Sequence, residues 1–316
     1  MKAVFLDRYA LNPGDLDTSR TVTLCDEVEF FDRTDTFEDT VKRIGNAEIV
    51  VINKAPITEE VLAACPNIKY VTVTATGYNV IDTEACARRG IPASNVPGYS
   101  TDSVSQHIFA LLLELAMHTG EHSLSVSHGD WAKCPDYTYH VTDLTELSGK
   151  TMGFIGMGAI GSMAARIAQA FGMRAVCYHS RNKVEGVDHL ELDELLRISD
   201  VVALCCPLTE DNKKIIRRET IEKMRDGAII INTSRGGLVD ENDLADAVKS
   251  GKIAGVGLDV LENEPPKNSS PLIGLKNVII TPHIAWAPKE SRERLLDVTI
   301  ANVKGYITGN IQNKVN

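Results

Sequence analysis

Short apolar runs alternate with longer segments of mixed polarity along most of the chain. In the first part of the chain the apolar runs lie at residues 2–6, 22–31, 49–52 and 70–73, and helical patterns lie at 36–44, after 58 and at 82–89. Short apolar runs are typical of strands that are buried on both faces. Their alternation with helices predicts a parallel sheet that is covered by helices.

A second series of the same kind begins at residue 151. Its six strand runs lie at residues 152–155, 175–178, 201–205, 228–232, 255–258 and 278–280. The sequence therefore predicts an α/β protein with two doubly wound parallel-sheet domains of the Rossmann or flavodoxin-like type. A last helix, at 289–308, is expected to return to the first domain. We therefore expect one domain of residues 1–99 plus 288–316, into which the second domain, residues 100–287, is inserted.

The segment between the two series is a long helix pattern at residues 103–117 that is apolar nearly all round. Such a helix is typically buried. A position between two domains and a position at a subunit interface both account for it. After this helix, residues 131–140 are aromatic and irregular, which is consistent with an arm or a pocket wall.

A glycine-rich turn follows the first strand of the second series and leads into a helical pattern. It reads Gly156-Met157-Gly158-Ala159-Ile160-Gly161. A strand, G-x-G-x-x-G and a helix in this order are typical of dinucleotide binding, because the helix N-terminus presents free N–H groups to the pyrophosphate. A purely structural turn is the alternative.

In NAD sites the next strand, here 175–178, usually ends in an acidic residue that accepts hydrogen bonds from the ribose 2′-hydroxyl. This chain has no acidic residue there. The strand ends instead in His179-Ser180-Arg181-Asn182-Lys183. Arg181 and Lys183 can pair with a 2′-phosphate, and Ser180 can donate a hydrogen bond to it. A solvated basic turn that tolerates either cofactor is the alternative. The sequence favours NADP.

Three ionisable residues each follow a strand of the second series: Arg235, Glu264 and His283. The carboxyl ends of parallel strands share one edge of a sheet, where ligands bind. Arginine can bind a carboxylate through two hydrogen bonds, and histidine can donate and accept a proton near neutral pH. A glutamate bonded to that histidine orients it and stabilises its charged form. Singly, each residue has a structural explanation, but together they predict an active site.

Composition restricts the class of protein. The 316 residues are enough for two domains, and 43% hydrophobic with 24% charged residues is ordinary for a globular enzyme. A net charge of −10 argues against nucleic acid and anionic membranes as partners. No apolar stretch approaches the ~18 residues of a membrane span. Seven scattered cysteines without metal-ligand spacing favour a reduced, cytoplasmic protein with no metal.

At these residues the chain resembles the D-isomer-specific 2-hydroxyacid dehydrogenases over nearly its whole length. The motifs that carry the resemblance lie at residues 96–101, 147–151, 232–236, 259–265 and 282–284. Gln106, Trp286 and residues 131–137 are similar to the glycerate dehydrogenase/hydroxypyruvate reductase branch. The resemblance implies an enzyme that reduces small 2-keto acids, such as hydroxypyruvate or glyoxylate, to D-2-hydroxy acids with NAD(P)H. It also implies a homodimer, which the apolar helix favours too.

The resemblance assigns a role to each candidate residue. Arg235 would bind substrate, and Glu264 with His283 would form the acid/base pair. Main-chain N–H groups of Thr76, Gly77 and Tyr78 would bind the substrate carboxylate, with Lys54 over the same pocket, although a solvated lysine is equally consistent. The expected cofactor residues are Gly156, Met157, Gly158, Ala159, Ile160, Gly161, His179, Ser180, Arg181, Cys206, Pro207, Thr233, Ser234, Asp259 and Ala285.

Other functions remain open from the sequence. A phosphoglycerate-type or lactate-type enzyme of the same architecture is possible, because the sequence does not define the shape of the pocket. A formate dehydrogenase is disfavoured, because it would pair the histidine with glutamine and this chain offers Glu264. A non-catalytic dinucleotide sensor is the alternative from another class, and the complete Arg/Glu/His set disfavours it.

Overall fold

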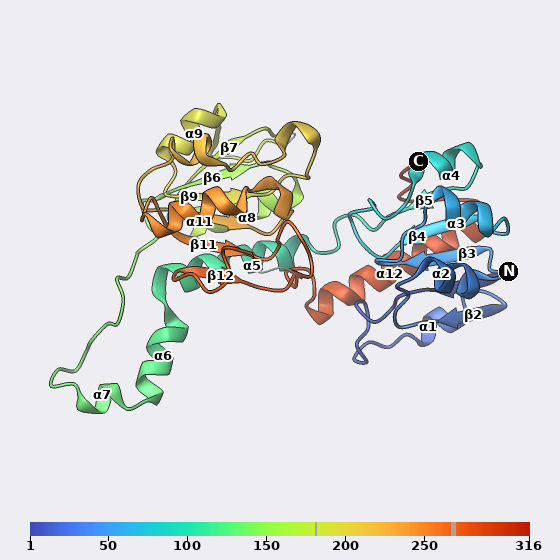
Figure 1. Ribbon diagram of the computed structural model, residues 1–316, viewed down its shortest axis with the longest axis horizontal. Helices are drawn as coiled ribbons and strands as arrows, with labels where there is room; N and C mark the ends of the chain where they lie inside the picture. Colours follow the sequence, from blue (N-terminus) through green and yellow to red (C-terminus); the bar gives the residue numbers. More distant parts are fainter. Residues whose placement is uncertain (181, 267–269) are drawn as a thin grey trace. The chain divides into compact units, whose positions relative to one another are not determined.

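The computed structural model describes residues 1–180, 182–266 and 270–316, which form two compact units. Unit 1 comprises Met1–Ser100 and Trp286–Asn316, and unit 2 comprises Thr101–Ala285 (Figure 1). The sequence predicts boundaries after residues 99 and 287. Arg181, a predicted cofactor residue, lies outside the described residues. Each unit is considered by itself below.

Unit 1 is a five-stranded parallel sheet in the order β2-β1-β3-β4-β5. Apolar side chains alternate between its two faces, and both faces are buried. One face packs against α2, α3 and α4, and the other packs against α12, which returns the end of the chain to this unit. The elements are β1 (Lys2–Phe5), α1 (Ser19–Val22), β2 (Glu27–Phe30), α2 (Phe37–Ile44), β3 (Ile49–Ile52), α3 (Glu59–Ala64), β4 (Tyr70–Val73), α4 (Thr83–Arg88), β5 (Ala93–Ser94) and α12 (Lys289–Ile307).

Unit 2 is a seven-stranded parallel sheet in the order β12-β11-β10-β9-β6-β7-β8. This is the doubly wound order of dinucleotide-binding domains, extended by one strand. Its elements are α5 (Thr101–Met117), α6 (Thr119–Ser127), α7 (Asp130–Lys133), β6 (Thr151–Ile155), α8 (Ala159–Ala170), β7 (Arg174–Tyr178), β8 (Val187–His189), α9 (Leu192–Ile198), β9 (Val201–Leu204), η1 (Glu210–Asn212), α10 (Arg218–Ile221), β10 (Ala228–Asn232), η2 (Gly236–Leu238), α11 (Glu241–Lys249), β11 (Ile253–Leu258) and β12 (Val278–Ile280).

The predicted fold class, two doubly wound parallel sheets, is confirmed, but the prediction of six strands for the second series is wrong. The strand that the sequence does not predict is β8, which pairs with β7 at the edge of the sheet. Its residues Asp188 and His189 are exposed. A polar edge strand has no continuous apolar run, so the hydrophobic pattern does not reveal it.

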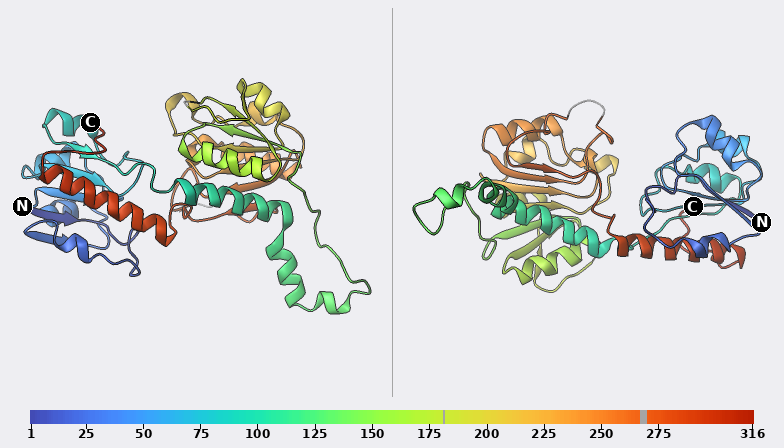
Figure 2. Two further views of the ribbon diagram at one scale, coloured as in Figure 1. Left: turned by 180° about the vertical axis from the view of Figure 1, so that it is seen from behind. Right: turned by 90° about the horizontal axis from the view of Figure 1, so that it is seen from below.

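Helix α5 buries most of its apolar side chains within unit 2. Ile108, Leu111, Leu112 and Leu115 lie in the core formed with the sheet and α8. Helices α5 and α8 lie side by side on this face (Figure 2), and α9, α10 and α11 cover the other face. The core of unit 2 itself therefore accounts for most of the apolar character of helix α5, for which the sequence analysis gives a position between two domains or at a subunit interface.

Helices α6 and α7 form an arm, residues 119–145, that leaves the end of α5 and extends away from the rest of unit 2 (Figures 1 and 2). Six of its large apolar side chains are exposed: Leu124, Val126, Trp131, Tyr137, Val141 and Leu144. Across the described part of the chain, no helix is both long enough and apolar enough to cross a membrane.

Candidate active site

The glycine turn connects β6 to α8. Gly156 has a φ of 95°, and a Cβ there would lie 2.8 Å from the carbonyl oxygen of Cys205, so only glycine fits. Gly158 precedes the first turn of α8, no side chain of the described residues caps this helix end, and a Cβ at Gly158 would point into open space. The first N–H groups of α8 are therefore accessible to an anion.

The surroundings of the turn fit a nicotinamide dinucleotide. The hydroxyls of Ser162 and Thr233 are buried and have no hydrogen-bond partner among the described residues. Unsatisfied buried hydroxyls need an explanation, and a bound polar ligand supplies one. Cys206 lies against Gly156, and burial raises the pKa of its thiol to about 11, so this side chain is uncharged. Pro207 accepts a hydrogen bond from Asn212 through its carbonyl oxygen, at 2.8 Å.

The loop after β7 carries the residues that bear on the choice of cofactor. His179 has a left-handed backbone with a φ of 58°. The Ser180 hydroxyl donates to the carbonyl oxygen of Asn182 and accepts from the N–H of Asn182, at 3.0 Å for the latter bond. The Ser180 side chain therefore closes its own turn.

Arg235, Glu264 and His283 follow β10, β11 and β12, which are neighbours in the sheet. Glu264 Oε2 lies 2.6 Å from His283 Nδ1. Glu264 Oε1 accepts a hydrogen bond of 2.9 Å from the N–H of Leu261. Arg235 is held by its own turn, where its Nη1 donates to the carbonyl oxygen of Ser234 at 2.7 Å. The structure brings Glu264 and His283 into direct contact.

Gly236 makes the position of Arg235 possible. A Cβ at Gly236 would lie 1.9 Å from the carbonyl carbon of Leu261 and 2.3 Å from the nitrogen of Glu262. Since both are main-chain atoms, no side-chain movement relieves the clash. The turn that carries Arg235 thus lies directly against the loop that carries Glu264.

The electrostatics of the pair follow from its surroundings. Burial opposes ionisation of Glu264, but the hydrogen bond and charge of His283 act against burial, together with the N–H of Leu261 and the charge of Arg235. The pKa of Glu264 is therefore lowered from its ordinary value of 4.5. An ionised Glu264 can only accept a hydrogen bond, so the contact with Nδ1 fixes the orientation of the His283 ring.

The predicted substrate residues of unit 1 lie at the carboxyl edge of its sheet. Lys54 follows β3, and its side chain is exposed. Thr76, Gly77 and Tyr78 follow β4, and their N–H groups donate to no acceptor among the described residues. The Thr76 hydroxyl donates to the carbonyl oxygen of Val96 at 2.8 Å, so only its N–H is available. Free N–H groups beside a lysine form a local site for an anion.

Asp7 organises this edge, and the sequence analysis did not identify it. Its carboxylate accepts hydrogen bonds from the N–H groups of Asn53, Lys54 and Ala55, at 2.6 Å for Asn53 and 2.7 Å for Ala55. Burial raises the pKa of Asp7, and these three bonds with the Lys54 charge limit the rise. Asp7 directly follows the first strand run, which is the same kind of position that Arg235, Glu264 and His283 occupy in the second series.

A histidine that is paired with a carboxylate can supply the proton that accompanies hydride transfer to a carbonyl, and a dinucleotide can supply the hydride. The fold and the site therefore place the chain in the class of nicotinamide-dependent oxidoreductases. Comparison with known proteins narrows the class, since residues 109–285 match the model of the D-isomer specific 2-hydroxyacid dehydrogenase, NAD binding domain. The chain belongs to the D-isomer-specific 2-hydroxyacid dehydrogenase family.

Relatives support the glycerate dehydrogenase/hydroxypyruvate reductase branch. A hydroxypyruvate reductase of Blautia hydrogenotrophica is 49% identical over the full length of both chains. A glycerate dehydrogenase of Methylorubrum extorquens is 39% identical over 99% of this chain and 98% of its own. Among solved structures, an acyclic imino acid reductase in complex with NADPH and D-Arg is similar over the full length of both chains, with a TM-score of 0.89 and 29% identity.

Proposed function

We propose that the protein reduces hydroxypyruvate or glyoxylate reversibly to the D-2-hydroxy acid, with NADPH preferred over NADH. The observation that carries the proposal is the 2.6 Å contact of His283 Nδ1 with Glu264 beside Arg235. The names of the relatives support small 2-keto acids as substrates.

The bound dihydronicotinamide supplies the hydride in this reaction. Glu264 occupies Nδ1 of the His283 ring, so Nε2 carries the proton that goes to the keto oxygen as hydride reaches the keto carbon. The Arg235 guanidinium binds the substrate carboxylate and polarises the adjacent carbonyl. In unit 1, Lys54 and the N–H groups of Thr76, Gly77 and Tyr78 are assigned to a substrate carboxylate.

Cofactor binding is assigned to the residues around the glycine turn and the strand ends of unit 2. The pyrophosphate is assigned to the turn from Gly156 to Gly161, and the adenosine part to His179, Ser180, Cys206 and Pro207. The nicotinamide part is assigned to Thr233, Ser234, Asp259 and Ala285. The preference for NADPH rests on the missing acid after β7 and on the NADPH in the similar imino acid reductase structure.

The purified protein should be mixed with hydroxypyruvate, and separately with glyoxylate, while the absorbance of NADPH or NADH is followed. Fast oxidation supports the proposal, and the ratio of the two rates measures cofactor preference. The variant His283→Gln should lower kcat by ~10²–10⁴-fold. If this variant kept near-normal turnover, the acid/base assignment would be overturned.

Negative results would separate the alternatives. Oxidation with phosphorylated or bulkier 2-keto acids alone would indicate a phosphoglycerate-type or lactate-type enzyme. Tight binding of NADPH without turnover of any 2-keto acid would indicate a dinucleotide sensor.

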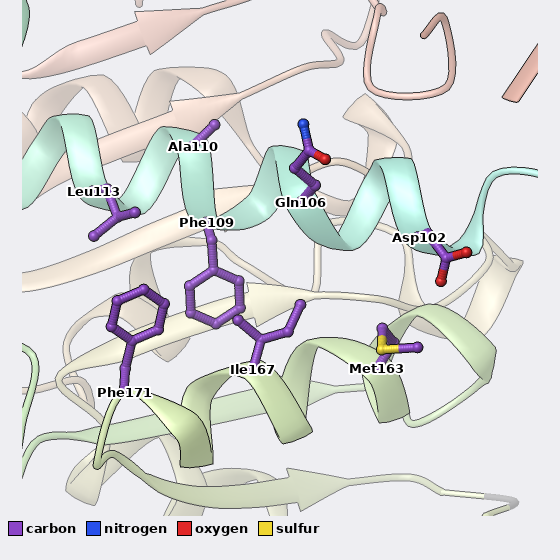
Figure 3. A pocket seen from close by; sticks show the side chains of 8 residues that line it. All are labelled: Asp102, Gln106, Phe109, Ala110, Leu113, Met163, Ile167 and Phe171. Atoms are coloured by element: carbon purple, nitrogen blue, oxygen red, sulfur yellow. The ribbon is translucent and has the colours of Figure 1, made fainter. Parts of the chain in front are cut away.

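We propose that the protein is a homodimer and that the second copy buries two apolar surfaces of unit 2. One is the arm, where Leu124 and Trp131 are more than half exposed (56% and 52%). The other is a groove of about 520 Å³ between α5 and α8 (Figure 3). Its walls include the stacked rings of Phe109 and Phe171, 5.5 Å apart, and Phe171 is 40% exposed. Exposed apolar area of this kind usually marks an interface.

Sedimentation of the wild type and of Leu124→Glu tests the assembly. The wild type should have twice the mass of the chain, and the variant should shift toward the single-chain mass while still binding cofactor. The control is Val22→Glu, a residue of unit 1 with a similar exposure of 58%. A wild type that sediments as a single chain would refute the dimer.

The proposed compartment is the cytoplasm. All seven cysteines lie within the described residues and are free thiols, which suits a reducing environment. Fractionation of cells that express the protein tests this placement.

A further inference from the structure

The backbone of His283 is held in an unfavourable conformation. Its φ is 54°, in the left-handed region. A residue other than glycine rarely adopts this conformation, and it persists only where surrounding contacts enforce it. The N–H of His283 donates to the carbonyl oxygens of Asp259 and Thr281, at 2.9 Å each. The position of the ring therefore depends on the loop from Thr281 to Ala285.

Asp259 holds this loop. Its side chain is 1% exposed. The carboxylate accepts hydrogen bonds from the N–H groups of Ile284 and Ala285, at 2.8 Å each, and from the Thr281 hydroxyl at 2.6 Å. Three consecutive N–H groups, at residues 283–285, thus converge on one aspartate. A buried carboxylate needs such donors, because an unpaired charge in the interior is costly.

His107 reaches this network from α5. Its Nε2 lies 2.9 Å from the Thr281 hydroxyl oxygen and 3.5 Å from Asp259 Oδ1. The side chain is 18% exposed. His107 is the only ring with hydrogen-bonding atoms in α5, and the catalytic assignment above does not use it.

The donor directions in this network follow from the chemistry of the hydroxyl. Thr281 has one hydrogen to give, and the ionised Asp259 at 2.6 Å can only accept it. The other acceptor, the carbonyl oxygen of Leu258, lies farther away at 3.4 Å. Having donated to Asp259, the hydroxyl can only accept from His107. The Nε2 of His107 therefore carries a hydrogen and donates it.

We propose that His107 is a positioning residue for the catalytic histidine. It donates to Thr281, which donates to the buried Asp259 carboxylate, and Asp259 fixes the left-handed loop that presents His283 to Glu264. The expected effect of His107 on turnover rests on the proposed function. Its expected effect on the geometry of the His283–Glu264 pair does not.

The test compares His107→Leu, which removes the donor, with His107→Gln, whose amide nitrogen reproduces a donor near Nε2. We expect kcat for keto-acid reduction to fall about 5- to 30-fold in His107→Leu and to recover to within about threefold in His107→Gln. Turnover is compared at saturating cofactor, because the network includes Asp259 and Ala285, which are assigned to the nicotinamide part of the cofactor. If His107→Leu does not fold, His107→Asn replaces it, since its amide is one methylene too short to reach Thr281.

A double-mutant cycle identifies the route. If His107 acts through Thr281, the effect of Thr281→Val on kcat should not add to that of His107→Leu. Three results would each overturn the proposal. The first is that the effects of Thr281→Val and His107→Leu on kcat multiply. The others are a wild-type kcat in His107→Leu and a loss of kcat that His107→Gln does not restore.

A second readout needs no substrate. The proton shared by His283 and Glu264 should give a downfield NMR signal in the wild type and in His107→Gln, and this signal should weaken or shift in His107→Leu. An unchanged signal in His107→Leu would overturn the proposal. A normal pattern of signals in a protein that reduces no keto acid would overturn the proposed function while leaving the positioning role intact.

Discussion

Replacement of Glu264 by glutamine tests the central pair of the site. The glutamine side chain would keep the shape of the glutamate and lose its charge. The contact of 2.6 Å between Glu264 Oε2 and His283 Nδ1 is a charge-assisted hydrogen bond. Such bonds contribute about 1.5–3 kcal/mol. The side chains of Glu264 and His283 are 35% and 43% exposed, so solvent screens part of the interaction and about 1–2 kcal/mol remains. At about 1.4 kcal/mol per factor of ten, kcat for reduction should fall about 5- to 30-fold.

Steady-state kinetics of Glu264→Gln in both directions measure this effect. The matched control is Glu262→Gln, which removes an exposed carboxylate from the same loop and should leave kcat unchanged. A kcat of Glu264→Gln within twofold of the wild type would refute the acid/base pairing.

Three further predictions concern stability and the support of the site. Asp7→Asn removes an anionic acceptor from three N–H groups, so the KM for the keto acid should rise about tenfold and the cofactor Kd should stay constant in fluorescence titration. Gly236→Ala places a Cβ 1.9 Å from main chain, so Tm should fall and kcat should drop at least about tenfold in calorimetry and kinetics. The pKa of Glu264 is lowered, so its contribution to stability is present above pH 4.5 and is lost as the pH falls below that value. The difference in Tm between the wild type and Glu264→Gln should therefore shrink in acid.

The sequence predicts those parts of the molecule that depend on short-range patterns. Strands buried on both faces leave apolar runs, and the glycine turn has a fixed spacing. Arg235, Glu264 and His283 could be grouped because each follows a strand, and parallel strands end at one edge. Edge strand β8 and the helices of the arm were not predicted, because neither buries a continuous apolar face.

The supporting residues depend on contacts that the sequence does not encode locally. Asp7 lies 46 residues from Asn53, whose N–H it accepts. His107 lies 174 residues from Thr281 and is one of several polar residues on α5. A polar residue in such a position is recognised only when the fold shows what it faces.

The topology of unit 2 explains why the sequence predicts Arg235, Glu264 and His283 but not the residues that hold them in position. Strands β10, β11 and β12 are adjacent in the sheet, and adjacent strands lie about 4.8 Å apart. The sheet therefore brings the loops that follow these strands close together. The main-chain contact at Gly236 and the Asp259 carboxylate then set their final positions. The substrate residues of unit 1 depend on a different network, centred on Asp7. Changes in the unit 2 network should consequently lower kcat, whereas changes at Asp7 should raise the KM for the keto acid. A variant at Asp7 that lowered kcat alone would contradict this division.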